Sequence, residues 1–372
     1  MVDLKSQYDT IASAVNNAIQ GVLDTTSYIN GPEVQQFQKN LENYLNVKHV
    51  IPCANGTDAL QIAMMALGLV PGDEVITADF TFAATVETIA LLQLTPVLVD
   101  VDIHNMNIDL EALKNAITPK TKAIIPVHLF GRAANMEAIM KIANQHNLFV
   151  IEDNAQAIGA NCRFSDGQKR KAGTIGHIGA TSFFPSKNLG CYGDGGAIFT
   201  NDDTLAHRIR GIANHGMYER YHHDVVGVNS RLDSIQAAVL NIKLPLLDQY
   251  NKARQEAARK YSNAFANHPN IVAPQICEQC DCHVFHQYTL RIIDANRDGL
   301  MQHLLEKGIP CAIYYPIPLH SQKAYQDIRY QESQFLITNQ LVNEVLSLPM
   351  HTELLDEQIE FISKSILEYL GS

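Results

Sequence analysis

An apolar strand that runs into a lysine and then into a glycine-rich turn occupies Thr181-Ser-Phe-Phe-Pro-Ser-Lys187-Asn-Leu-Gly-Cys-Tyr-Gly-Asp-Gly-Gly196. Lysine is rare at the end of a buried strand because protein interiors exclude unpaired ammonium groups. Partial burial lowers the pKa of a lysine and makes its amine a nucleophile, which is the reactivity that Schiff-base chemistry needs. The glycines allow the backbone to fold closely around a ligand. A surface lysine in an ordinary turn is the alternative for this segment taken alone.

Strand-like and helix-like stretches alternate around this segment, from about residue 45 to residue 200. The apolar runs that we interpret as strands are residues 49–53, 74–77, 96–101, 123–127, 149–152, 180–184 and 197–200. The stretches that we interpret as helices are residues 58–69, 83–92, 110–116 and 136–145. Such alternation predicts a mostly parallel sheet of seven strands with helices on both faces. Ligands of such sheets bind at the carboxyl ends of the strands, so motifs that follow strands are expected to meet there.

The pattern changes near residue 235. Two long helices are predicted at residues 235–250 and 253–265, followed by a polar, cysteine-bearing loop at 267–283. A strand at 287–292, a helix at 297–307, a strand at 312–315 and two closing helices complete the chain. We therefore predict an α/β fold with a large domain, residues 1–245, and a smaller C-terminal α+β domain, residues 246–372.

Composition narrows the class of protein. A chain of 372 residues with 46% apolar and 18% charged residues is typical of a globular protein of about two domains. The net charge of −11 argues against a general binder of nucleic acid or anionic membranes. Seven scattered cysteines argue against a disulfide framework. Neither a signal-peptide pattern nor an apolar run of about 20 residues is present, so we expect a soluble, cytoplasmic protein with no membrane partner.

Signatures of other cofactors are missing from the sequence. There is no G-x-G-x-x-G after the first strand, no G-x-x-x-x-G-K-[ST] and no H-E-x-x-H. The run Cys277-Glu-Gln-Cys280-Asp-Cys282-His283 is similar to a metal-binding knuckle. No second Cys/His pair follows it at zinc-finger spacing, so we interpret it as a polar loop and predict no metal.

A second strand ends in an acid, in Val150-Ile-Glu-Asp153-Asn-Ala-Gln156. In enzymes that use pyridoxal 5′-phosphate (PLP), an aspartate pairs with the pyridinium nitrogen and keeps the ring an electron sink. Asp153 suits this role, and Gln156 is placed to hydrogen-bond the ring hydroxyl. The alternative is an aspartate that caps a helix after a strand, which is common.

Two further strand–helix junctions are candidates for binding a phosphorylated, aromatic cofactor. In Cys53-Ala-Asn-Gly56-Thr57-Asp58, the unpaired N–H groups and the positive dipole end of the following helix would favour a phosphate. In Asp79-Phe-Thr-Phe82-Ala-Ala-Thr85, Phe82 is placed to stack on an aromatic ring. A plain helix cap and a core phenylalanine are the respective alternatives.

Together these segments resemble the DegT/DnrJ/EryC1/StrS family of PLP-dependent sugar aminotransferases, nearly from end to end. The stretches that carry the resemblance include Asn55-Gly-Thr-Asp-Ala-Leu, Glu152-Asp-Asn-Ala-Gln, Ser182-Phe-Phe-Pro-Ser-Lys187, Gly227-Val-Asn-Ser-Arg231-Leu-Asp and Tyr315-Pro-Ile-Pro-Leu-His320. The resemblance implies the type I fold of PLP-dependent transferases, like that of aspartate aminotransferase. Some members with histidine in place of the lysine dehydrate sugars, so Lys187 implies transamination.

The resemblance also implies a role for each candidate cofactor residue. Lys187 would join the cofactor covalently and then move the proton, while Asp153 would hold the pyridinium nitrogen. Gln156 would face the ring hydroxyl, and Phe82 would stack on the ring. The residues implied to bind the phosphate are Gly56, Thr57, Ser182 and, from the neighbouring subunit, Asn229. The active sites would then lie at the interface of a homodimer.

Within the family, the chain most resembles aminotransferases that act on UDP-2-acetamido-2-deoxy-3-oxo-glucuronic acid. The likeness includes Arg220-Tyr-His-His and residues 185–203. It implies L-glutamate as donor and a 3-amino sugar for surface polysaccharide or lipopolysaccharide as product. Arg231 would pair with the carboxylate of the sugar through two parallel hydrogen bonds. The other residues implied to contact the substrate are Tyr314, Tyr315 and His320.

Two alternatives stay open. The subgroup has His-Tyr-Pro where this chain has Tyr314-Tyr315-Pro316, so the substrate is alternatively another 3- or 4-keto deoxysugar linked to dTDP, UDP or GDP. A catalytically silent regulator or scaffold with the same fold is the second alternative. Such a protein would be expected to lack Lys187 or Asp153, and both are present.

Overall fold

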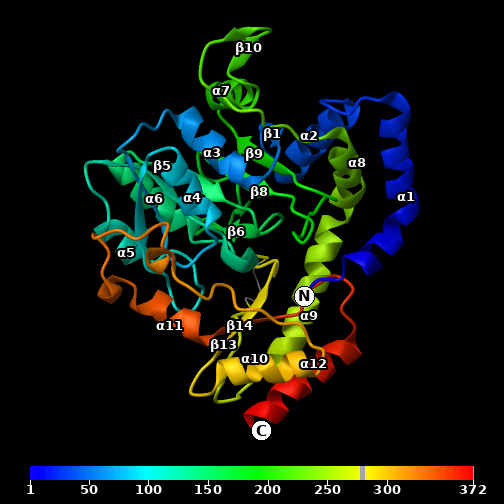
Figure 1. Cartoon of the computed structure of the whole chain (residues 1–372), viewed down its shortest axis with the longest axis vertical. Coiled ribbons are helices and arrows are strands. Elements are labelled where there is room, and N and C mark those ends of the chain that lie inside the picture. The colour runs from blue at the N-terminus through cyan, green and yellow to red at the C-terminus, as the bar shows by residue number, and fades with distance from the viewer. Residues whose placement is uncertain (277–280, 372) are drawn as a thin grey trace.

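The computed structural model describes residues 1–276 and 281–371. Its centre is a seven-stranded sheet (Figure 1). The strands in spatial order are β1 (His49–Cys53), β9 (Gly196–Thr200), β8 (Ile178–Ser182), β5 (Phe149–Asp153), β4 (Thr121–Ile125), β2 (Glu74–Ala78) and β3 (Thr95–Val99). Strand β9 is antiparallel to both of its neighbours, and the other neighbouring pairs are parallel. The predicted mostly parallel, seven-stranded sheet is therefore confirmed.

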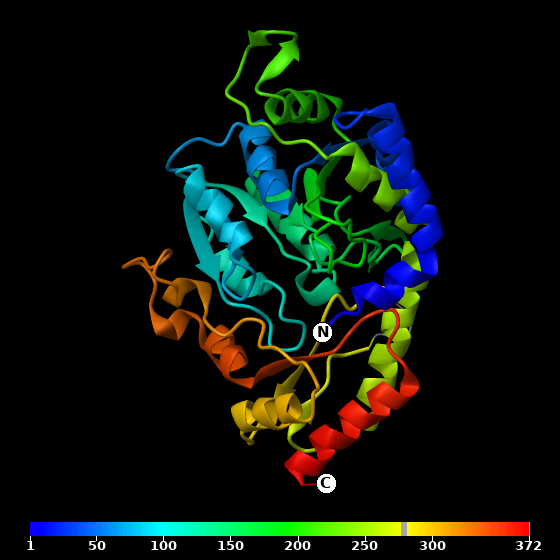
Figure 2. The same cartoon turned by 45° about the vertical axis from the view of Figure 1, so that its right-hand side comes forward.

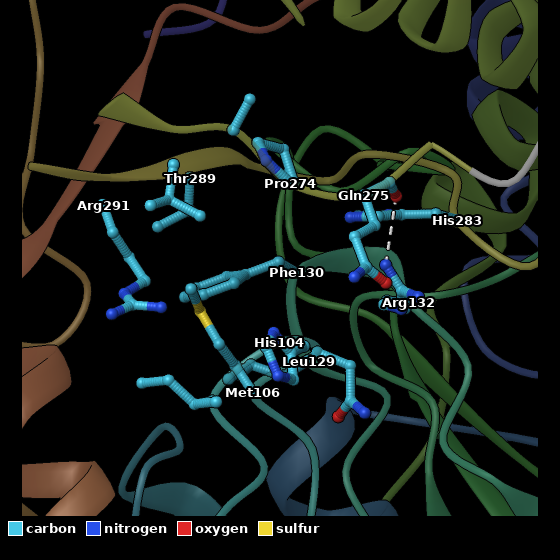
Figure 3. Close-up of a pocket in the computed structure, with 14 residues that line it drawn as sticks. His104, Met106, Leu129, Phe130, Arg132, Pro274, Gln275, His283, Thr289 and Arg291 are labelled. Atoms are coloured by element: carbon cyan, nitrogen blue, oxygen red, sulfur yellow. Dashed lines mark hydrogen bonds between the residues drawn. The ribbon is translucent and has the colours of Figure 1, made fainter. Parts of the chain in front are cut away.

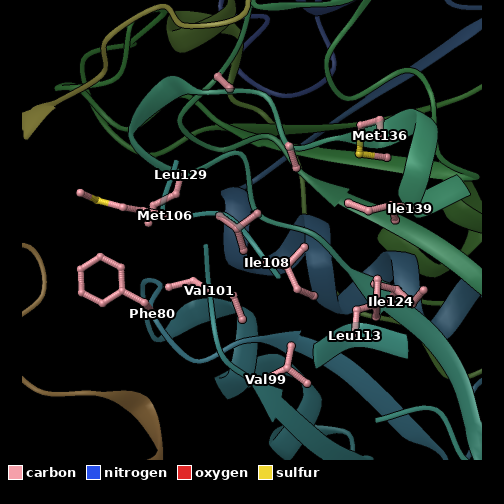
Figure 4. Close-up of a cluster of buried hydrophobic side chains, with 14 of the residues drawn as sticks. Phe80, Val99, Val101, Met106, Ile108, Leu113, Ile124, Leu129, Met136 and Ile139 are labelled. Atoms are coloured by element: carbon pink, nitrogen blue, oxygen red, sulfur yellow. The ribbon is translucent and has the colours of Figure 1, made fainter. Parts of the chain in front are cut away.

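Helices cover both faces of this sheet. In β4, Ile124 packs into one core and its neighbours Ala123 and Ile125 pack into another, because successive side chains of a strand point to opposite faces. The helices that contribute to the second core are α3 (Gly56–Leu67), α4 (Ala84–Leu91) and α7 (Asp203–Ala213). The first core, part of which is drawn in Figure 4, includes α5 (Leu110–Asn115) and α6 (Met136–His146). The large unit thus has three layers.

The N-terminal helices were not predicted from the sequence. Helix α1 (Leu4–Thr25) packs along α8 (Ser234–Lys243), as Figures 1 and 2 both show, and α2 (Pro32–Leu45) packs on α8 and β1. Phe37 of α2 and Phe199 of β9 share a core with Leu240 of α8. These helices therefore close the end of the sheet that β1 and β9 form.

The prediction of helices at 235–250 and 253–265 is wrong at their junction. The chain breaks instead at a short 3-10 turn, η2 (Leu244–Leu246), between α8 and α9 (Leu247–Ala264). Pro245 explains the position, because proline has no N–H to donate and its ring clashes with the preceding helical turn. The predicted boundary between residues 245 and 246 falls in this turn and stays a prediction.

The C-terminal part has its own core around an antiparallel sheet of three strands. The strands are β12 (Ile271–Val272), β13 (Tyr288–Ile292) and β14 (Val345–Leu348), and the helices are α10 (Arg297–Glu306), α11 (Leu336–Glu344) and α12 (Asp356–Leu370). The predicted strand at 312–315 is wrong, since only Ala312 makes an isolated bridge, to Ser347. Strand β14 was missed because its run of four residues lies between two helical patterns.

Two short hairpins lie outside these sheets. They are β6 (Asn161–Arg163) with β7 (Lys169–Lys171), and β10 (Met217–Glu219) with β11 (His222–His223). The β10–β11 hairpin stands away from the body of the chain in both cartoons (Figures 1 and 2). Among the described residues, no helix is long and apolar enough to cross a bilayer.

Candidate active site

A cavity of about 390 Å³ opens where β1, β2, β5 and β8 end. Its walls come from both the large sheet and the C-terminal part, through His286, Tyr314 and Tyr315. The residues predicted for the site that line it are Gly56, Thr57, Phe82, Asp153, Gln156, Ser182, Lys187, Tyr314 and Tyr315. The structure therefore brings together nine side chains or backbones that the sequence spreads over 260 positions, from 56 to 315.

Lys187 lies in the turn that follows β8, and its backbone N–H donates to the carbonyl of Phe184 at 2.8 Å. The turn requires glycine at position 190, where a Cβ would come within 2.3 Å of the Pro185 carbonyl oxygen. Burial lowers the pKa of Lys187 to about 8, although the carboxylate of Asp153 acts in the opposite direction. At pH 7.5 about a quarter of such an amine is neutral, against about 0.1% for an ordinary lysine. The sequence-based prediction of an activated amine fits this geometry.

Asp153 is the last residue of β5 and is 5% exposed. Its Oδ2 accepts a hydrogen bond from Thr85 Oγ1 at 2.8 Å, and its Oδ1 accepts one from the N–H of Ala155 at 3.1 Å. Burial raises the pKa of Asp153, while these two hydrogen bonds and the nearby Lys187 lower it. Because both donors favour the ionised form, they offset part of the cost of burying this carboxylate.

The residue before Asp153 fixes the loop on the opposite side of β5. Glu152 is fully buried and accepts hydrogen bonds from His128 Nε2 at 2.9 Å and from the N–H groups of Gly173, Ile175 and Gly176 at 2.6–2.8 Å. His128 Nδ1 accepts a hydrogen bond from the backbone N–H of Ala134, so its Nε2 carries the hydrogen and donates it in the hydrogen bond to Glu152. Glu152 thus holds the loop at 173–176, whereas Asp153 lines the cavity.

Helix α3 presents its first N–H groups to the same cavity. Asn55 accepts from the N–H of Asp58 through its side chain and from the N–H of Ala59 through its carbonyl. No residue in the described ranges accepts from the N–H of Gly56 or Thr57. These two N–H groups and the positive end of the helix dipole form a site for an anion such as a phosphate.

The opposing wall of this anion site is Ser182, which ends β8. Its Oγ accepts from the N–H of Phe184 at 3.2 Å, which leaves its own hydrogen free to donate. The approach is so close that a Cβ on Gly56 would lie 2.8 Å from Ser182 Cβ. Only glycine at position 56 allows this spacing without a shift of the backbone.

Aromatic rings form the other side of the cavity. Tyr315 lies 6.1 Å from the ring centres of Phe80 and Phe82, and it stacks on Phe130 at 6.4 Å. Gln156 accepts from the N–H of Phe130 at 2.6 Å and donates to the Tyr315 hydroxyl at 3.2 Å. Burial raises the pKa of Tyr315, so its hydroxyl stays protonated at physiological pH. The amide of Gln156 therefore orients the tyrosine in addition to facing the cavity.

Three predicted residues lie elsewhere. Asn229 and Arg231 precede α8 and do not line the cavity of their own chain, and Asn229 is exposed and bridges to Asn214. Their predicted roles, which for Asn229 require a second subunit, stay predictions. His320 is buried against Asp79 and does not line the cavity. Its predicted contact with the substrate stays a prediction.

Thr85, Phe130 and His286 are among the residues of the site, or in contact with it, that sequence reasoning missed. Thr85 ends the Asp79–Thr85 segment, and the sequence does not identify its partner, because its contact with Asp153 spans 68 positions. Phe130 adopts a left-handed backbone conformation, with φ of 56°, which the sequence around it does not predict. His286 is 5% exposed, and burial, together with Lys187 and Arg254, lowers its pKa well below the usual value, so its ring is neutral.

A second, smaller cavity shares Phe130 with the first (Figure 3). It measures about 60 Å³ and carries Arg132 and Arg291 on its walls, with no acidic residue. Sites for cofactors and small molecules are usually several hundred Å³, so this volume is too small for one. The 390 Å³ cavity is the candidate active site.

Among the described residues, no group of three or more His, Cys, Asp or Glu side chains could hold a metal. Residues 277–280 of the cysteine-bearing loop lie outside the described ranges, and the prediction for that loop is therefore untested.

Comparisons with known proteins point to one family. Residues 9–367 match the DegT/DnrJ/EryC1/StrS aminotransferase family. The chain is 46% identical to a UDP-2-acetamido-2-deoxy-3-oxo-D-glucuronate aminotransferase from Pseudomonas aeruginosa, with 98% of each chain covered. It is 43% identical to a protein from Geobacillus stearothermophilus named a pleiotropic regulatory protein, with 99% of this chain and 98% of the other covered. It is also 43% identical to a UDP-N-acetyl-3-dehydro-alpha-D-glucosamine 3-aminotransferase from Acidithiobacillus ferrooxidans, over 98% and 96%.

Solved structures give the same result. A DegT/DnrJ/EryC1/StrS aminotransferase from Brucella abortus superposes with a TM-score of 0.94 at 43% identity, covering 100% of this chain and 99% of the other. NtdA from Bacillus subtilis, solved with bound cofactor PMP, superposes with a TM-score of 0.90 at 32% identity, over 97% and 82%. The predicted family and the predicted fold are both confirmed.

Proposed function

Because the chain belongs to the DegT/DnrJ/EryC1/StrS aminotransferase family, we propose that it transfers the amino group of L-glutamate to a nucleotide-linked 3-keto-sugar with PLP as cofactor. The preferred substrate is UDP-2-acetamido-2-deoxy-3-oxo-glucuronate, and the products are the 3-amino sugar and 2-oxoglutarate. The relatives named for this sugar and for a UDP-linked 3-dehydro-glucosamine support the substrate class. The observation that carries the proposal is the presence of Lys187 and Asp153 on the walls of one cavity.

The residues of the cavity fit this cofactor on grounds of their own chemistry. The unpaired N–H groups of Gly56 and Thr57 and the hydroxyl of Ser182 would hold its phosphate. Phe82, which is 57% exposed at the cavity wall, would cover one face of its ring. Asp153 would hold the ring nitrogen and Gln156 the ring hydroxyl. Bound in this way, PLP supplies an electron sink for the carbon that loses its proton.

Lys187 has two tasks in the proposed reaction. Its amine would hold the cofactor in the resting enzyme and, once released, would take a proton from the amino-bearing carbon and later return one. A pKa of about 8 suits both tasks, because the group accepts and returns a proton near neutral pH. Neutral His286 adds no second positive charge beside this amine.

The sugar would occupy the side of the cavity that Tyr314 and Tyr315 form, where the C-terminal part closes over the sheet. We further propose a homodimer in which Asn229 and Arg231 of each chain complete the partner's site. The neighbouring side chains Tyr221 and Val226 are apolar in large part and are 76% and 85% exposed, which suits burial against a second copy. Location in the cytoplasm and a product destined for surface polysaccharide stay part of this proposal.

Purified protein, PLP, glutamate and the UDP-linked 3-keto-uronate provide the direct test, with the product followed by mass. The wild-type enzyme should add one amino group per sugar, and Lys187→Ala should abolish both turnover and the visible absorption of the lysine-bound cofactor. Lys252→Ala, at an exposed position of α9, is the matched control and should keep both. Full turnover in the Lys187 variant would reject the proposal.

A different keto-sugar is the second candidate, because the chain has Tyr314-Tyr315 where uronate aminotransferases tend to have His-Tyr. Relatives named for dTDP-linked and GDP-linked sugars are also similar to this chain. Arg231→Leu separates the two: it should weaken use of a uronate at least tenfold more than use of a 6-deoxy sugar. Equal losses of activity with both sugars would contradict the pairing of Arg231 with the sugar carboxylate.

The regulatory relative calls for a separate check of catalysis. Mixing the PLP-loaded protein with glutamate alone should bleach the absorption of the lysine-bound cofactor. A protein that binds PLP yet shows no change with glutamate would be a silent member of the family.

A further inference from the structure

Asp79 and His320 make a buried contact across 241 positions of the chain. Asp79 follows β2 and is fully buried, and His320 is 6% exposed. Asp79 Oδ1 accepts from the backbone N–H of His320 at 2.7 Å, and Asp79 Oδ2 lies 2.7 Å from its Nδ1. Both carboxylate oxygens are thus used by a single residue.

The charge state of this contact is consistent with a strong hydrogen bond. Burial raises the pKa of Asp79 to about 6, although His320 lowers it, so the carboxylate is ionised at neutral pH. An ionised acceptor makes hydrogen bonds roughly twice as strong as a neutral one. The other ring nitrogen, His320 Nε2, lies 3.2 Å from Glu332, and the ring stacks on Phe335 at 4.3 Å. The orientation of the imidazole is therefore fixed from three sides.

His320 ends a short segment that begins in the active site. This strap, residues 315–320, contains Pro316 and Pro318, which restrict its backbone. Leu319 donates its N–H to the carbonyl of Asp79 at 3.3 Å and packs with Phe335 in a small apolar core. One end of the strap is thus attached to Asp79, and the other end carries Tyr315 in the cavity wall.

Asp79 also begins the segment that carries Phe82, the neighbour of Tyr315 in the cavity wall. Three residues further on, Phe82 lines the cavity, with its ring 6.1 Å from that of Tyr315. Thr85, which donates to Asp153, follows on α4. The contact between Asp79 and His320 therefore ties together the two segments whose neighbouring rings line the cavity.

We propose that His320 is a positioning residue: through Asp79 it sets the relative position of the neighbouring rings of Tyr315 and Phe82, and hence the shape of the aromatic wall on the sugar-binding side of the cavity. It does not touch the substrate. The identity of the substrate rests on the proposed function, whereas the positioning itself does not.

Two substitutions at the same position test this role. The amide of His320→Asn can place a donor near the position of Nδ1 and retain the bond to Asp79, whereas His320→Leu removes it. The Leu variant should raise the KM of the keto-sugar about tenfold with kcat within about threefold, and the Asn variant should restore most of the loss. Glu332→Gln, which alters only an exposed partner, is the control and should change KM less than about twofold.

A double variant tests whether His320 acts through Tyr315. If it does, the fold-loss in kcat/KM of the double variant Tyr315→Phe, His320→Leu should be clearly smaller than the product of the two separate fold-losses. The effects of residues that share one function are not additive. Losses that multiply, or an Asn variant as impaired as the Leu variant, would overturn the proposal. An unchanged KM accompanied only by reduced folded protein would do the same.

Two readouts keep this test separate from the proposed function. Hydrogen exchange of peptides covering the strap should accelerate in His320→Leu and return toward wild type in His320→Asn. The double-variant comparison can also be made on the bleaching of the loaded enzyme by glutamate, with no sugar present. If the wild-type enzyme fails on the keto-sugar while these two results hold, the substrate assignment fails and the positioning role stands.

Discussion

The pKa of Lys187 near 8 makes loading of the cofactor depend on pH in a measurable way. Only the neutral amine attacks the aldehyde of PLP, and the neutral fraction grows as pH rises through the pKa. At pH 7 about one tenth of the lysine is neutral, against about 0.04% for an ordinary pKa of 10.4, a difference of about 230-fold. The loading rate should rise about tenfold from pH 6 to pH 7 and level off above pH 8.

Asp153→Asn changes this profile in a direction that the structure fixes. The carboxylate of Asp153 raises the pKa of Lys187, so its removal should move the midpoint below 8. Stopped-flow mixing of the cofactor-free protein with PLP, followed by visible absorption, gives both profiles. A wild-type midpoint near 10, or a midpoint that rises in Asp153→Asn, would refute the reasoning.

Three further changes have defined outcomes. Thr85→Val removes a hydrogen bond that lowers the pKa of Asp153, so the acid limb of the kcat/KM profile should move up by about one pH unit, whereas Thr85→Ser should leave it in place. Glu152→Gln puts an NH2 group opposite two buried N–H donors and should lower the free energy of unfolding in urea by about 2–6 kcal/mol; a loss below about 1 kcal/mol would contradict the geometry. Gly56→Ala crowds Ser182 and should raise the Kd for PLP about tenfold or more in fluorescence titrations, and unchanged affinity would show that the contact relaxes freely.

Local features of the fold were predictable because their causes lie within short segments. The apolar runs ending at Asp153 and near Lys187 are strands whose burial on both faces shows directly in their composition. The Gly56-Thr57 helix start likewise follows from the residues around it. Since parallel strands end at one edge of a sheet, placing these motifs after strands was enough to predict their convergence.

Contacts between distant segments were not predictable in the same way. The position of His320 depends on a carboxylate 241 residues away, and nothing in the Pro318-Leu319-His320 run identifies Asp79 as its partner. The break at Pro245 was missed because an apolar helical pattern continues on both sides of it. The apolar run at 312–315 has the composition of a strand, but after a single bridge at Ala312 its residues Tyr314 and Tyr315 line the cavity.

The placement of Asn229 and Arg231 shows a different limit. Both precede α8 and do not line the cavity of their own chain. The role that the resemblance implies for Asn229 needs a second subunit, and we propose the same for Arg231. Activity should therefore return when a chain carrying Lys187→Ala is mixed with one carrying Asn229→Ala, because one of the two sites in the mixed dimer is intact.

The covalent attachment of PLP to Lys187 is tested most directly by borohydride reduction of the loaded enzyme, followed by digestion and mass spectrometry. We predict one reduced cofactor per chain, on the peptide that contains Lys187, and none after prior incubation with glutamate. A label on another lysine, or no label on a protein that still turns over the keto-sugar, would contradict the account.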